Sequence, residues 1–87
     1  MDKRHQDNLT TRLEEAKLLG CTHIAWAELY LWYGVQKIAA RTYRDLEERW
    51  QALTDGEIGK LMMIDGRGGI FIFGAKKAKP IDENSGS

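Results

Sequence analysis

Hydrophobic residues recur at helical spacing near the start of the chain. Leu9, Leu13 and Ala16 are three or four residues apart, and polar side chains fill the positions between them. This pattern is typical of an amphipathic helix that packs one face on a core. We therefore predict a helix over residues 8–19, which Gly20 ends as a C-cap.

Two further segments have helical patterns. Residues 26–33 are apolar on nearly every face, Glu28 is their only charge, and Gly34 follows them. A helix of this kind is buried on more than one side. A third helix is predicted from Ile38 or Ala39 to Leu53, and its apolar stripe consists of Tyr43, Leu46, Trp50 and Leu53.

The last third of the chain has the pattern of a β-hairpin. Two apolar runs, residues 61–64 and 70–73, flank a five-residue loop that contains Asp65, Arg67 and three glycines. Glycine and aspartate supply the backbone conformations that hairpin turns need. Residues 21–24, between the first two helices, form a short β-tolerant stretch.

These elements predict one α+β domain, with three helices and a C-terminal two-stranded β-hairpin. A chain of 87 residues has room for one small domain, which we place at residues 8–74. We expect residues 1–7 to be a frayed N-terminus. Residues 75–87 begin with a Lys-rich stretch and are predicted to form a flexible tail.

Charge and composition exclude several classes of protein. Thirteen Lys and Arg residues balance thirteen Asp and Glu residues, which excludes a polybasic protein. Residues 58–80 nevertheless hold five cations and a single acid, a net charge of +4. One cysteine, Cys21, excludes an intrachain disulfide and fits the reducing cytoplasm. No apolar run approaches the roughly 18 residues of a membrane span.

The sequence lacks the residue sets that catalysis and metal binding require. No serine precedes Ser85, so the predicted domain has no serine nucleophile. His5 and His23 have no further ligands at metal-binding spacing, and the carboxylates are scattered over predicted helix surfaces. We therefore expect neither an enzyme nor a cofactor.

Three segments carry a resemblance to a known superfamily. Gly34-Val35-Gln36 is similar to the turn of a helix-turn-helix, and Arg41-Thr42-Tyr43-Arg44-Asp45-Leu46 is similar to the start of a recognition helix. Gly66-Arg67-Gly68-Gly69-Ile70-Phe71 is similar to a wing tip and its returning strand. With the element order, they resemble the winged helix-turn-helix domains of small bacterial regulators. More chain separates the turn from the third helix than in the tightest such motifs.

This resemblance implies a small dimeric transcriptional regulator that binds double-stranded DNA sequence-specifically. The third helix would lie in the major groove, and the hairpin, as the wing, would contact phosphates or the minor groove. Arginine pairs with guanine edges, and other polar residues position the protein on the phosphates. The residues placed against DNA are Gln36, Lys37, Arg41, Thr42, Arg44, Arg67, Lys76 and Lys77.

The basic and the aromatic residues each have a second interpretation. Arg41 and Arg44 both precede a carboxylate by four residues, so ion pairs on a solvated helix face explain them equally well. The aromatic residues of the second helix are too many for one small core and predict an exposed patch for a homodimer or a protein partner. That patch consists of Trp26, Tyr30, Trp32 and Tyr33. The alternative function is a winged-helix protein-interaction or assembly module that does not bind DNA.

Overall fold

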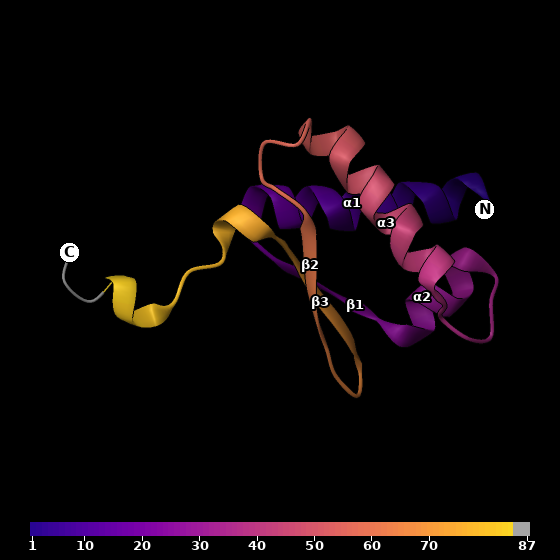
Figure 1. The fold of residues 1–87 in the computed structure, drawn as a ribbon. Helices are drawn as coiled ribbons and strands as arrows, with labels where there is room; N and C mark the ends of the chain where they lie inside the picture. Colours follow the sequence, from indigo (N-terminus) through magenta and orange to yellow (C-terminus); the bar gives the residue numbers. More distant parts are fainter. Residues whose placement is uncertain (85–87) are drawn as a thin grey trace.

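The computed structural model describes residues 1–84 and contains three α-helices and three β-strands. Their order is helix, strand, helix, helix, strand, strand (Figure 1). The elements are α1 (Lys3–Leu19), β1 (Thr22–Ala25), α2 (Trp26–Tyr33), α3 (Ala40–Thr54), β2 (Leu61–Asp65) and β3 (Gly69–Gly74), and two short 3-10 turns follow at Ala75–Lys77 and Ile81–Asn84. The fold is α+β, as predicted.

The sheet has three antiparallel strands in the order β1–β3–β2, so the predicted hairpin gains a third strand. β1 pairs with β3, with Thr22 opposite Ile72 and Ile24 opposite Ile70. The predicted hairpin forms as β2 and β3, and the β-tolerant stretch at residues 21–24 adds a third strand. The sequence did not predict this pairing because β1 is only four residues long and its partner lies far along the chain. Gly69 permits the close approach of β1, since a Cβ at this position would lie 2.1 Å from the carbonyl oxygen of Ile24.

α1 begins at Lys3 rather than at residue 8. Asp2 is its N-cap, and the Asp2 carboxylate accepts a hydrogen bond of 2.8 Å from the backbone N–H two residues later. The first turns face solvent and the apolar pattern starts only at Leu9, so most of the segment predicted to be frayed is helical. α1 ends at Gly20, as predicted, where a φ of 102° favours glycine.

The two later helices lie close to their predicted bounds. α2 occupies the predicted residues and ends at Gly34, which has a left-handed conformation. The Glu28 carboxylate accepts a hydrogen bond of 3.0 Å from the backbone N–H of Ala25 and thereby caps the first turn. α3 begins at Ala40 and ends before Asp55. Helix ends are set by capping residues and glycines close to them in the sequence. The predicted bounds therefore lie close to the observed ones.

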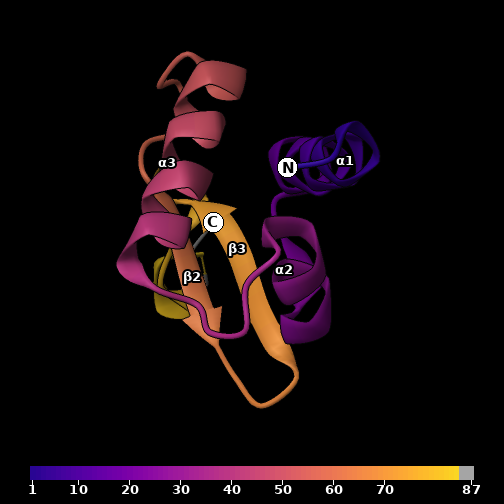
Figure 2. The same ribbon diagram turned by 90° about the vertical axis from the view of Figure 1, so that its right-hand side faces the viewer.

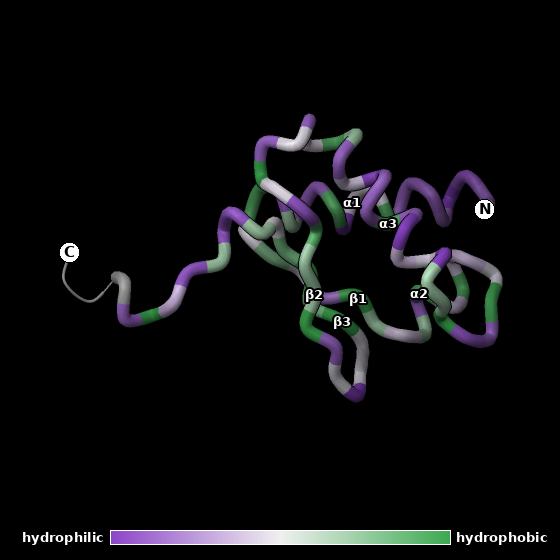
Figure 3. Tube along the Cα trace, viewed as in Figure 1, coloured by the Kyte–Doolittle hydropathy of each residue, from purple (hydrophilic) through white to green (hydrophobic). Residues whose placement is uncertain are grey.

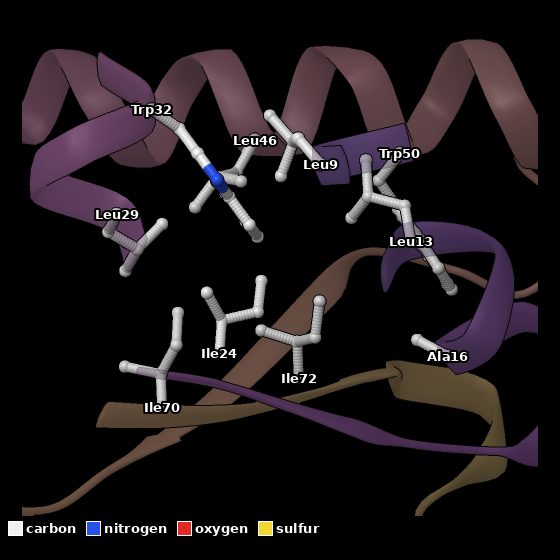
Figure 4. Packing of buried hydrophobic residues seen from close by; sticks show 10 residues of the cluster. All are labelled: Leu9, Leu13, Ala16, Ile24, Leu29, Trp32, Leu46, Trp50, Ile70 and Ile72. Carbon is white, nitrogen blue, oxygen red and sulfur yellow. The ribbon is translucent and has the colours of Figure 1, made fainter. Parts of the chain in front are cut away.

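The core lies between the helices and one face of the sheet (Figures 2 and 4). All three helices and the strands β1 and β3 contribute to it. Burial of one such large side chain is worth about 1.5–3 kcal/mol. Figure 3 shows the first turns of α1 and the hairpin tip as hydrophilic, in contrast to the sheet. The buried hydrophobic residues are Leu9, Leu13, Ala16, Ile24, Leu29, Trp32, Leu46, Trp50, Ile70 and Ile72.

Trp32 belongs to this core, so the prediction that it lies in an exposed aromatic patch is wrong. Its side chain is 4% exposed, and the Arg12 guanidinium lies over the ring, 5.6 Å from the centroid. Trp26 and Tyr33 are half-buried against the core, whereas Tyr30 is 38% exposed. The domain accommodates these rings because α2 contacts α1 as well as β1 and β3.

The segment after β3 starts as part of the fold. The backbone N–H of Ala75 donates to the Lys60 carbonyl at 2.8 Å, and that of Lys76 donates to the Ile58 carbonyl at 2.9 Å. Residues 75–77, predicted to be part of a flexible tail, are therefore attached to the chain just before β2. Residues 85–87 of the predicted tail lie outside the described residues.

Candidate nucleic-acid interface

α3 turns one face to the core and exposes the other. Leu46 and Trp50 are buried on the inner side, whereas Arg41 and Arg44 are exposed. Because a helix repeats every 3.6 residues, the two arginines lie on the side that faces away from the core. The sequence pattern predicted this division correctly.

Thr42 does not lie on the exposed face of α3 with Arg41 and Arg44. Its side chain is only 7% exposed, and it lies on the buried face of α3, one turn before Leu46. The prediction that Thr42 contacts DNA is therefore not supported by its position. Thr42 is polar, so the apolar pattern did not include it. It precedes the buried Leu46 by four residues, however, and this spacing places both residues on the same face of α3.

Asp45 is held by Tyr33 and Arg49 rather than by Arg41. Its carboxylate accepts hydrogen bonds from the Tyr33 hydroxyl and from Nε of Arg49, both at 2.7 Å. Burial raises the pKa of Asp45, but these two donors outweigh burial and lower the pKa below its usual value. Among residues 1–84, neither Arg41 nor Arg44 makes a salt bridge. The ion pairs considered for them from the sequence do not form.

A polar cleft of about 310 Å³ borders this network, and Arg41 and Thr42 also line it. Burial and the hydrogen bond to Asp45 raise the pKa of Tyr33, so its hydroxyl remains protonated and donates. Arg49 and Asp45 neutralise each other within the cleft. Two arginines line the cleft. Arg49 pairs with Asp45, whereas Arg41 has no ion-pair partner among the described residues.

Glu47 links the middle of α3 to the start of β2 through a hydrogen bond. Its Oε2 accepts a hydrogen bond of 2.7 Å from the backbone N–H of Leu61, and its Oε1 accepts one of 2.9 Å from the Gln51 amide. The Trp50 indole N–H and the Gln51 amide both donate to the Gly59 carbonyl, at 3.1 and 3.2 Å. These bonds fix the hairpin relative to α3.

Trp26 makes hydrogen bonds to the tip of the hairpin. The indole N–H of Trp26 donates to the Gly66 carbonyl at 2.8 Å, and its backbone N–H donates to the Gly68 carbonyl at 3.1 Å. Within the turn, the Gly66 N–H donates to the Gly69 carbonyl at 2.9 Å. Arg67 lies on this tip and is exposed. Sequence reasoning missed this role of Trp26 because 40 residues separate it from Gly66.

The N-terminal end of α3 is the end nearer to the level of the hairpin tip. Figures 1 and 2 show α3 running upward from the low loop that precedes it, with the tip projecting below this loop. Tyr43 of the first turn of α3 lines one cavity with Leu61 and Met63 of β2, so this part of α3 lies close to β2. Burial and the Asp65 carboxylate raise the pKa of Tyr43. The exposed predicted residues in these parts of the chain are Gln36, Lys37, Arg41, Arg44 and Arg67.

Lys76 and Lys77 lie at the opposite end of β3. They belong to the 3-10 turn that follows Gly74, whereas the hairpin tip precedes Gly69. β3 has six residues, which span roughly 20 Å. The two lysines therefore do not join Arg67 and the arginines of α3 on one surface.

Other kinds of site find no support within the described chain. No group of three or more His, Cys, Asp or Glu side chains in residues 1–84 is arranged to hold a metal ion. Cys21 is a free, exposed thiol. In the same residues, no helix has both the length and the apolar character needed to cross a membrane.

No protein-family model matches the chain, and neither a curated protein nor a solved structure matches it. A functional assignment therefore rests on the residues and their geometry. Two features distinguish this surface: two exposed arginines on α3 without ion-pair partners within residues 1–84, and a hairpin that Glu47 holds at its base and Trp26 holds at its tip.

Proposed function

We propose that the chain is a sequence-specific DNA-binding protein of the winged helix-turn-helix type, acting as a small transcriptional regulator. In this proposal α3 lies in the major groove of double-stranded DNA, and the β2–β3 hairpin is the wing. The observation that carries it is the exposure of Arg41 and Arg44 without ion-pair partners, at the end of α3 that lies nearer to the level of the hairpin tip and Arg67. The order of helices and strands is compatible with this type of domain.

Each exposed cation has a defined role in this arrangement. Arg41 and Arg44 reach base edges, where a guanidinium binds O6 and N7 of guanine with two hydrogen bonds. Lys37, in the loop before α3, contacts phosphates and sets the position of the helix. Arg67 contacts the backbone or enters the minor groove. Trp26 and Glu47 order the wing before binding, which lowers the entropic cost of association.

A titration of labelled duplex DNA at low salt tests the proposal. The pool of duplexes should cover many sequences, because the target site is unknown. We expect the double variant Arg41→Ala, Arg44→Ala to bind at least about tenfold more weakly, since one good arginine–base contact is worth about 1–3 kcal/mol.

The matched control is the double variant Lys60→Ala, Lys76→Ala, whose exposed lysines flank the Leu61–Gly74 pair at the end of the hairpin away from the tip. It removes the same charge at that end, so duplex affinity should change by no more than about threefold, the effect of general charge. Failure of the wild-type chain to bind any duplex contradicts the proposal. Equal losses in the two double variants contradict the assigned surface.

The second candidate function is a protein-interaction module without DNA binding. The observation that favours it is the exposure of Tyr30 and Leu31 on α2, at 38% and 62%. A homodimer through α2 is also compatible with the first proposal, because two copies of α3 would fit half-sites about 34–36 Å apart. Sedimentation at rising protein concentration, with Leu31→Asp as the disrupting variant, tests for self-association. An interaction of this kind depends little on salt.

A further inference from the structure

The sheet has a second face, which no helix covers within residues 1–84. Side chains alternate along a strand, so the isoleucines of β3 face the core while Phe71 and Phe73 point to the other side. The strand register puts Ile64 opposite Phe71 and Met62 opposite Phe73. Phe71 is 50% exposed, and Met62 and Ile64 are exposed as well. With His23, which lies opposite Phe71 on β1, these residues make up the outer sheet face.

The middle of the outer sheet face carries aromatic rings. At one end of this face lies a hollow that is lined partly by lysines. The His23 and Phe71 rings contact each other, with centroids 4.7 Å apart and planes tilted by 56°. Phe73 lies two residues farther along β3, roughly 7 Å away. It borders a shallow hollow of about 360 Å³, which Lys77 and Lys79 also line.

Positive charge gathers at the end of the outer sheet face that carries Phe73. Lys76, Lys77 and Lys79 follow β3 at this end, and β1 and β3 contain no acidic residue. Arg67 lies at the opposite end of β3, and the first acid after β3 is Asp82, three residues beyond Lys79. Asp65 of β2 lies opposite Ile70, so it points to the core side of the sheet. Two copies packed face to face would bring like charges together, which is unfavourable. A polyanion is attracted instead.

We propose that the outer sheet face binds single-stranded nucleic acid. Unpaired bases stack on Phe71 and Phe73, and the phosphates lie at Lys77 and Lys79. Rings for stacking beside a positively charged path are the combination that single-strand binding requires. The proposal goes beyond duplex binding by α3 and does not depend on it, because it uses the opposite side of the sheet.

The test is fluorescence anisotropy with a labelled oligothymidine of about ten nucleotides, a length typical of single-strand sites. Phe71→Leu keeps an apolar side chain but removes the ring, and we expect about tenfold weaker binding. Phe71→Tyr keeps the ring, so its affinity should stay within about twofold of wild type. An oligouridine of equal length distinguishes DNA from RNA as the natural ligand.

A second variant keeps the test decisive if Phe71→Leu fails to fold, which thermal unfolding reports. Lys77→Gln with Lys79→Gln alters only exposed side chains. It should weaken oligothymidine binding and lower the slope of log affinity against log salt concentration by about one unit or more.

Three results would overturn the proposal. The first is no saturable binding of oligothymidine at low salt. The second is equal affinity in Phe71→Leu and Phe71→Tyr, which would leave only non-specific charge attraction. The third is a salt-insensitive dimer that Phe71→Leu dissociates, which would assign the outer sheet face to a second copy of the chain.

Discussion

Adjacent carboxylates of α3 have different surroundings. Glu47 accepts hydrogen bonds from the Leu61 backbone and the Gln51 side chain, whereas Glu48 is exposed. Asp45 accepts hydrogen bonds from two residues, one on α2 and one on α3. A charged residue in an amphipathic pattern is therefore not always a solvated one, and its contribution to stability depends on its partner.

We expect Glu47→Ala to lower the free energy of unfolding by about 1–3 kcal/mol, because it leaves the Leu61 N–H without its acceptor. Glu48→Ala is the matched control, since it removes the same group from the next position. Its effect should stay within about 0.5 kcal/mol. Urea unfolding measures both, and equal values would contradict the structural role of Glu47.

Stability should decline in acid through Asp45 and Glu28. Burial raises the pKa of both carboxyl groups, but hydrogen bonds from Tyr33 and Arg49 to Asp45, and from Arg12 and a backbone N–H to Glu28, bring both below their usual values. A pKa lowered by folding stabilises the protein above the unfolded value of about 4, and that stability is lost as the pH falls through the folded pKa.

Urea unfolding at a series of pH values measures this dependence. We expect a nearly constant free energy of unfolding from about pH 7 to 5 and a decline below about pH 4. Asp45→Asn should make the decline shallower, because it removes one of the groups responsible. An identical decline in Asp45→Asn would show that Asp45 does not contribute.

Among the secondary-structure elements, the hairpin is held at both ends by contacts that are distant in the sequence. One end is attached to α3 through Glu47, and the tip is attached to the start of α2 through Trp26. Turn residues alone predict that a hairpin forms, but they contain no information on its orientation. The orientation determines where Arg67 lies, so the proposed wing depends on these two attachments.

Trp26→Phe should loosen the hairpin tip without unfolding the domain. The substitution keeps an aromatic ring against the core but removes the indole N–H that donates to Gly66. We expect the Gly66 amide to exchange with solvent about fivefold faster or more, the effect of losing roughly 1 kcal/mol.

Amide hydrogen exchange followed by NMR measures this effect in the free protein, independently of any ligand. Tyr30→Phe is the control, since it lies on the same helix and its ring is exposed. Unchanged exchange at the tip in Trp26→Phe would contradict the anchoring role.

For the whole molecule, the distribution of charge matters more than its sum. The formal net charge is zero, yet exposed cations lie at the beginning of α3 and at the hairpin tip, and Lys76 and Lys77 lie beyond the other end of β3. In the proposed functions, local charge of this kind attracts a polyanion and releases its counterions, so we expect the binding to depend on salt.

If Arg67 contacts a phosphate, Arg67→Ala should reduce the slope of log affinity for duplex DNA against log salt concentration by about one unit. Lys76→Ala should leave that slope unchanged, because Lys76 lies at the far end of β3. Anisotropy titrations at several salt concentrations give both slopes. A slope that Lys76→Ala lowers as much as Arg67→Ala would contradict the separation of the two ends.

The sequence by itself determined the elements and the exposed cations of α3. Periodic apolar residues and the glycines at helix ends are local signals, so the bounds of α2, the end of α1 and the hairpin runs are predicted correctly. The exposure of Arg41 and Arg44 follows from the same periodicity. These features depend on neighbours within a few residues along the chain.

Only the tertiary structure decided how the elements are joined. It placed β1 beside β3, buried Trp32, and paired Asp45 with Tyr33. Each of these contacts joins parts of the chain that no local pattern relates, and each depends on how the faces of different elements meet. Polar groups find their hydrogen-bond partners, and apolar groups their packing partners, anywhere in the fold. A pattern along the chain does not show which distant residues become these partners.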